Sequence, residues 1–138
     1  MSENDAVDAL VQTSFVVMGT LTEVAKRHGL SLTQLRVFGI IRDREPRISD
    51  LAAFLGLDKS TLSGLVDRAV ARGLIERVRN DDDGRSVRIR LTPEGRELAE
   101  RVHDDVRRGL APLLQRLSPQ GQARLASHLG MVLDTPDA

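Results

Sequence analysis

The spacing of apolar residues along the chain predicts a series of helices interrupted by one hairpin. Between residues 6 and 28, apolar side chains recur every three or four positions, which indicates an amphipathic helix. A second helix is expected to start at Ser31 or Thr33, because either residue is a suitable N-cap. We expect it to end at the Glu45–Pro46 step, since the residue before a proline resists the helical conformation.

Two short helices follow, separated by a glycine. Residues 48–55 are predicted to form the first of them, with Ser49 as its N-cap, and Gly56 then permits a tight turn. Asp58 is expected to cap the second helix, which runs to about Arg72. Two short helices around a glycine turn are the outline of a helix-turn-helix unit.

A change of period marks a β-hairpin after the two short helices. Apolar and arginine side chains alternate over residues 87–91, and residues 75–79 are expected to form the partner strand. The polar segment NDDDGRS joins the two. Thr92 then caps a long helix predicted over residues 93–117, and Ser118 with the following proline begins a last one.

Composition places the chain among small helical proteins. Its 138 residues suit one domain, and 41% hydrophobic but only 2% aromatic content implies a core of Leu, Val, Ile and Ala. Without cysteine, disulfides, cysteine-ligated zinc and thiol redox sensing are excluded. An acidic N-terminus and the lack of a long apolar run argue against a secretory signal or a membrane span, so we expect a cytoplasmic protein.

The predicted helix over residues 59–72 has two different faces. Its apolar residues form one inward stripe, whereas small and basic residues occupy the remaining face. Hydroxyl groups at a helix N-terminus suit DNA phosphates and base edges. Gly64 costs about 1 kcal/mol relative to alanine, which close approach to a duplex would explain, although a tolerated surface glycine is the alternative. The candidate DNA contacts here are Lys59, Ser60, Thr61, Ser63, Gly64 and Arg68.

The tip of the hairpin supplies a second group of candidate DNA contacts. Arg85 at such a tip can enter a minor groove, where the electrostatic potential is most negative, and Asp83 can orient its guanidinium. The alternative is an ordinary solvated turn, because Asp and Gly are common turn residues. Ser49 and Arg77 complete the candidate DNA contacts.

The segments over residues 51–78 and 80–95 together resemble the MarR family of bacterial regulators, and the likeness extends over nearly the whole chain. The residues that carry its wing motif are Asp83, Arg85, Leu91, Thr92 and Gly95. The resemblance implies a dimer clamped by the N- and C-terminal helices. It also implies that residues 59–72 read the major groove and that Arg85 reads the minor groove. Many members of this family have a larger polar residue at the place of Gly64.

A homodimer is also expected from the apolar faces alone. The first, long and last helices have more apolar surface than the short elements can cover, and such surface tends to be buried against a second copy. The predicted interface residues are Val7, Leu10, Val106, Leu110, Leu113, Leu114, Leu117, Leu125 and Leu129. The expected fold is therefore mostly α with a small β-hairpin wing. Residues 1–30 and 93–138 provide dimerisation helices around a winged helix-turn-helix core over residues 31–92.

The sequence carries no recognisable catalytic or metal site. Its three histidines, His28, His103 and His128, are scattered, so we expect no enzyme, no metal and no cofactor. A small-molecule effector is implied only by the resemblance. Its pocket would involve Phe15, Met18, Arg36 and Phe38, which equally suit a plain core.

These patterns predict a sequence-specific regulator that binds double-stranded DNA. We expect a repressor that acts as a homodimer on a pseudo-palindromic operator, since two related reader helices match two half-sites. The alternative is a winged-helix module for protein–protein interaction, or an anti-regulator without DNA binding.

Overall fold

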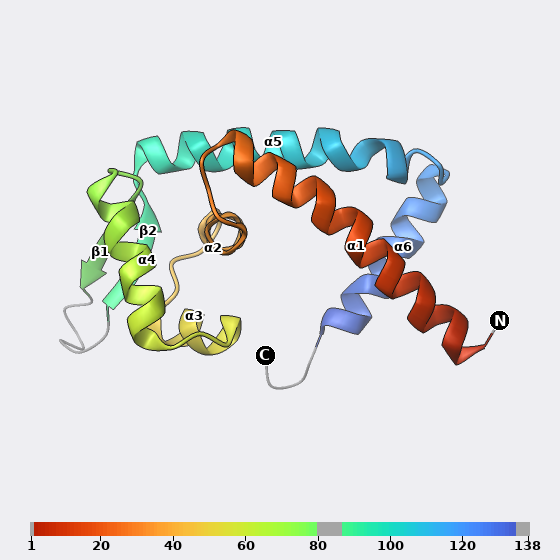
Figure 1. Cartoon of the computed structure of the whole chain (residues 1–138), viewed down its shortest axis with the longest axis horizontal. Coiled ribbons are helices and arrows are strands. Elements are labelled where there is room, and N and C mark those ends of the chain that lie inside the picture. The colour runs from red at the N-terminus through yellow and green to blue at the C-terminus, as the bar shows by residue number, and fades with distance from the viewer. Residues whose placement is uncertain (1, 80–86, 135–138) are drawn as a thin grey trace.

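The computed structural model describes residues 2–79 and 87–134, so the candidate contacts Asp83 and Arg85 lie outside the described residues. In chain order the elements are α1 (Glu3–Arg27), α2 (Leu32–Ile41), α3 (Ile48–Leu55), α4 (Lys59–Ala71), β1 (Ile75–Arg79), β2 (Val87–Leu91), α5 (Pro93–Leu114) and α6 (Pro119–Leu133). The prediction of a mostly helical fold with one hairpin is confirmed. Figure 1 shows α3, α4 and the hairpin gathered near one end of α5, and α6 with the start of α1 near the other.

Four of these helices begin at a hydroxyl side chain that caps them. Ser2, Ser31, Thr92 and Ser118 each accept a hydrogen bond from the backbone N–H three residues later. At α2 the contact is reciprocal, because the Gln34 side chain also accepts from the Ser31 N–H at 2.8 Å. The same arrangement between Ser2 and Asp5 starts α1 at Glu3, earlier than the apolar pattern predicted.

The predicted cap of α3 is wrong. Arg47 occupies the N-cap position, and Ser49 is the second residue of the helix. The chain before α3 is tied to the hairpin instead, since the N–H of Ile89 donates to the carbonyl of Pro46 at 3.1 Å. This extended segment also explains why α2 ends at Ile41, before the predicted stop at Pro46.

The end of α5 also differs from the prediction. The helix ends at Leu114 rather than Leu117. Gln122 of α6 donates from Nε2 to the carbonyls of Leu114 and Leu117, at 3.0 and 3.3 Å. The Leu114 carbonyl also accepts from the N–H of Leu117 at 3.0 Å, so the last carbonyl groups of α5 have hydrogen-bond partners where the chain turns.

The core lies where α2 meets α4, α5 and the hairpin. Phe38 is its largest side chain and is only 1% exposed. The strands pair antiparallel from Ile75 opposite Leu91 to Arg79 opposite Val87, and this register points the apolar side chains into the core. The predicted inward stripe of α4 is confirmed, with its buried members Leu62, Leu65, Val66 and Ala69.

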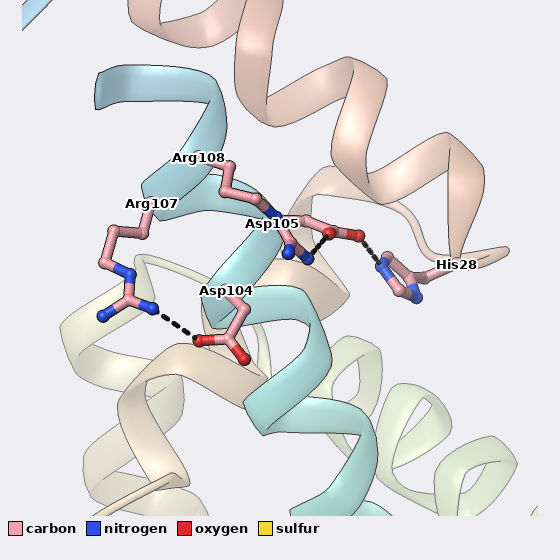
Figure 2. Close-up of polar contacts among 5 residues, drawn as sticks. All are labelled: His28, Asp104, Asp105, Arg107 and Arg108. Atoms are coloured by element: carbon pink, nitrogen blue, oxygen red, sulfur yellow. Dashed lines mark hydrogen bonds and ion pairs between the residues drawn. The ribbon is translucent and has the colours of Figure 1, made fainter. Parts of the chain in front are cut away.

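A polar contact ties the end of α1 to α5. Nε2 of His28 is hydrogen-bonded to Asp105 at 2.7 Å, and Arg108 donates to the other oxygen of that carboxylate at 2.7 Å (Figure 2). Arg108, and secondarily His28, hold the pKa of Asp105 below its usual value. Arg107 pairs with Asp104 on the exposed side of the same helix (Figure 2). The contact at Asp105 fixes the point where the chain leaves α1 for the winged part of the fold.

The first half of α1 and the whole of α6 leave apolar side chains uncovered. Not one residue of α6 is buried. The most exposed large apolar side chains are Val7, Leu10, Val11, Phe15, Val16, Phe54, Met131, Val132 and Leu133. Within residues 2–79 and 87–134, no helix combines the length and the apolar character needed to cross a membrane.

Candidate nucleic-acid interface

Helix α4 presents its polar face to solvent. The apolar side of the helix is buried in the core, as Leu62 and Val66 show. The structure therefore places the predicted contact residues of this helix together on the outward side. Lys59, Ser60, Thr61 and Arg68 are exposed, and Ser63 and Gly64 are half-buried.

The N-termini of α3 and α4 differ from those of the other four helices. Neither Arg47 before α3 nor Asp58 before α4 forms a side-chain hydrogen bond to the helix. Asp58 therefore occupies the predicted N-cap position, but its side chain does not cap α4. The first N–H groups of a helix have no partner within it, and they carry the positive end of the helix dipole. The N–H groups of both termini are therefore suited to donate hydrogen bonds to phosphate oxygens.

Ion pairs divide the basic side chains near α4 into two groups. Arg77 of β1 pairs with Asp67 of α4, and Arg90 of β2 pairs with Glu76 at 2.5 Å. The hydrogen bond that Arg90 donates to the Glu76 carboxylate raises the pKa of Arg90. Among the described residues, Arg68 has no ion-pair partner, so its charge is available at the surface while that of Arg77 is partly neutralised.

Two arginines near α3 were missed by the sequence analysis. Arg47 and Arg88 are brought together by a β-bridge between the segment before α3 and β2, and Arg88 also donates to the carbonyl of Glu45 at 3.0 Å. They lie beside Ser49, which is exposed on the first turn of α3. The only signal in the sequence was the alternation of arginine with apolar residues over 87–91, which places Arg88 on the outward side of the strand.

The residues predicted to line an effector pocket are only partly brought together. Met18 of α1 and Arg36 of α2 line one cavity of about 450 Å³, together with Leu21, Leu32, Thr33, Leu35, Leu55 and Leu57. Phe38 lines a smaller cavity of about 170 Å³ against α5, and Phe15 is 75% exposed. Arg36 also borders a third cavity, of about 520 Å³, where its guanidinium carbon lies 5.5 Å from the ring centroid of Phe54.

The predicted dimer residues fall into two sets. Val106 packs against the core of the protomer, and Leu110 and Leu125 are half-buried. The others are exposed: Val7, Leu10, Leu113, Leu114, Leu117 and Leu129. In the described part of the chain, no three histidine, aspartate or glutamate side chains form a group that could hold a metal ion.

Comparison with known proteins places this arrangement in a family. A family model described as "MarR family" matches residues 28–86. The homoprotocatechuate degradative operon repressor of Escherichia coli is 29% identical over 99 residues, which cover 71% of this chain and 67% of the repressor. The chain spans about half the length of several of the curated relatives it matches.

Solved structures share nearly the whole fold. The apo form of MarR from E. coli has a TM-score of 0.73 and 25% identity, covering 97% of this chain and 98% of that one. NadR in complex with 4-hydroxyphenylacetate has a TM-score of 0.78 at 22% identity, covering 90% of this chain and 89% of that one.

Proposed function

The chain belongs to the MarR family of winged helix-turn-helix regulators, and from this we propose that it is a homodimeric repressor that binds a pseudo-palindromic site in double-stranded DNA. The observation that carries the proposal is the outward face of α4. Small hydroxyl groups lie on this face together with Arg68, which has no ion-pair partner among the described residues. The helix N-terminus beside them lacks a side-chain cap. This combination favours insertion into a major groove with phosphates held at the helix end.

The uncovered apolar faces support the dimer. The end of α5 and the start of α6 lie at the far end of the molecule from α4 and the hairpin, so a second copy can cover them and leave α4 free (Figure 1). A two-fold dimer presents two copies of α4, which fit half-sites whose centres are about 10 bp apart. The role of repressor is supported by the likeness to the E. coli operon repressor.

Binding to the DNA that flanks its own gene tests the proposal. We expect a footprint with two symmetric halves, and an affinity that falls steeply with salt because phosphate contacts release counterions. A single protected half-site, or retention that ignores ionic strength, would contradict it. The protein-binding alternative would then be favoured.

The wing is tested in the same assay by Arg85→Ala. We propose that Arg85 enters the minor groove, so its removal is expected to weaken binding by about 1–3 kcal/mol and to reduce the salt slope. Asp83→Ala is expected to give a smaller loss, since it only orients the arginine. Melting curves provide the control, because a variant that has lost only a DNA contact should melt like the parent in the absence of DNA. Parent-like affinity and salt slope for Arg85→Ala would show that the wing assignment is wrong.

We also propose that an aromatic carboxylate releases the repressor from DNA. Support comes from the cavity that Arg36 lines together with Met18 and other apolar side chains, and from the likeness to NadR with its bound 4-hydroxyphenylacetate. The cavity lies between α1 and the turn that joins α3 to α4. A ligand there can alter how α1 supports the DNA-binding helices.

The probe for this effector is 4-hydroxyphenylacetate itself. We expect it to stabilise the free protein, by about 2.7 kcal/mol at 100 times its Kd, and to lower affinity for the operator. Arg36→Met is expected to abolish both effects, because the carboxylate loses its cation. Arg44→Met is the matched control, since Arg44 lines the neighbouring cavity and is not among the residues that line this one. No change in melting temperature with the parent protein would overturn this part of the proposal.

A further inference from the structure

Gly64 lies in the outward face of α4, although no contact within the described protomer requires a glycine there. Its φ is not positive, and a Cβ at this position would meet only Nη1 of Arg68, at 3.6 Å. That is an ordinary van der Waals distance, so an alanine would fit. Because glycine is a poor helix former, its presence is not explained by the stability of α4.

The space beside Gly64 is occupied by the guanidinium of Arg68, which lies one helical turn further along. Side chains four positions apart are neighbours on a helix surface. The 3.6 Å approach therefore means that Arg68 extends back along the helix towards its N-terminus. A longer side chain at position 64 would compete for the place that this guanidinium takes.

Arg68 is also unusual in its electrostatic surroundings. Its neighbour Asp67 is bound by Arg77 of β1 and so is drawn towards the hairpin. Within the described residues, no acid pairs with Arg68. Ser60 and Ser63 lie on the same outward face, one turn or more before Arg68, and both have short side chains. Arg68 is therefore the long, positively charged side chain in the middle of this face.

On the premise that the chain binds DNA as proposed above, we propose that Arg68 recognises a guanine in each half-site and that Gly64 provides the space for it. A guanidinium presents parallel N–H donors that match O6 and N7 of guanine, which is the commonest specific contact in the major groove. Because the guanidinium of Arg68 lies along the helix, it can contact the edge of a base opposite the middle of α4. Glutamine has no charge and matches N6 and N7 of adenine instead, so a glutamine variant separates base recognition from phosphate binding.

Selection from a duplex library randomised over about 20 bp tests this inference. The parent is expected to enrich sites that share one G·C pair in symmetric positions of both halves. With Arg68→Gln, the preference for this G·C pair is expected to fall about ten- to hundredfold, whereas the loss of a phosphate contact would weaken binding to every duplex alike and reduce the salt slope. If Arg68→Gln keeps the parent preference, Arg68 contacts phosphate and the inference is wrong. A parent that retains no duplex at all would overturn the proposed function, and this inference with it.

Variants of Gly64 provide a second, independent test of this inference. Gly64→Leu is expected to reduce the same G·C preference about tenfold, because the longer side chain displaces the guanidinium. Gly64→Ala is the graded comparison and should lose less of the preference than Gly64→Leu, since its methyl group would lie at an ordinary contact distance of 3.6 Å from Arg68. Melting curves show whether α4 is still folded in both variants. If Gly64→Ala instead weakens binding to every sequence alike, glycine serves close approach of the backbone, and its assigned role beside Arg68 is wrong.

Discussion

Leu114→Asp is expected to convert the proposed dimer into monomers and to weaken binding to the proposed operator at least a hundredfold. Leu114 is 39% exposed in the protomer and lies at the end of α5, away from the buried core. In a two-fold dimer each substitution occurs twice, and a charge placed in an apolar interface costs about 3 kcal/mol or more. Sedimentation should then show the 15.2 kDa chain mass rather than twice that value.

Gln115→Asp is the matched control for this prediction. It introduces the same charge at the next residue, the C-cap of α5, and at 3.6 residues per turn this residue points away from Leu110 and Leu114. This variant should remain dimeric and bind the operator like the parent. Circular dichroism should show helical content in both variants, since neither residue contributes to the core. A Leu114→Asp protein that stays dimeric would mean that the end of α5 is not the interface.

The order and type of the elements could be predicted because each is recorded in local patterns. Residues 48–55 have the predicted bounds, and Thr92 caps α5 as expected. The stripe of α4 follows from helical periodicity, since its inward residues recur every three or four positions. At these positions the pattern fits a helix and does not fit a strand.

The errors arise where distant parts of the chain meet. Ser49 suited an N-cap by residue type, but the pairing of Pro46 with Ile89 fixes the chain so that Arg47 takes that position. The end of α5 depends on Gln122, a side chain from the next helix. Such contacts leave no periodic signal in a single sequence.

The candidate site shows the same division. The outward placement of Ser60 and Arg68 follows from the stripe behind them, whereas the pair formed by Asp67 and Arg77 depends on how α4 packs against β1. The residues proposed to line an effector pocket could not be separated from the core by sequence, because apolar residues of the core and of a cavity wall have the same pattern. Phe38 illustrates this, since its helical spacing would suit either location.

Gly95→Ala is expected to destabilise the winged core severely, although alanine is the better helix former. Gly95 is buried in the first turn of α5, where that turn packs against the backbone of Leu74 between α4 and β1. A Cβ here would lie 1.9 Å from the carbonyl oxygen of Leu74, far inside contact distance. That oxygen accepts the N–H of Thr92 at 3.1 Å, so it cannot move without breaking the junction between the hairpin and α5.

The expected loss in free energy of unfolding is about 3 kcal/mol, because overpacking against backbone forces the two segments apart. For a chain of this size the melting temperature should fall by roughly 10 °C. Gly39→Ala is the matched control, since it makes the same change inside α2 where a Cβ meets nothing within 4 Å. That variant should gain up to about 1 kcal/mol from helix propensity. A Gly95→Ala protein that melts like the parent would show that α5 does not approach Leu74 this closely in solution, and the position of the hairpin relative to α5 would have to be revised.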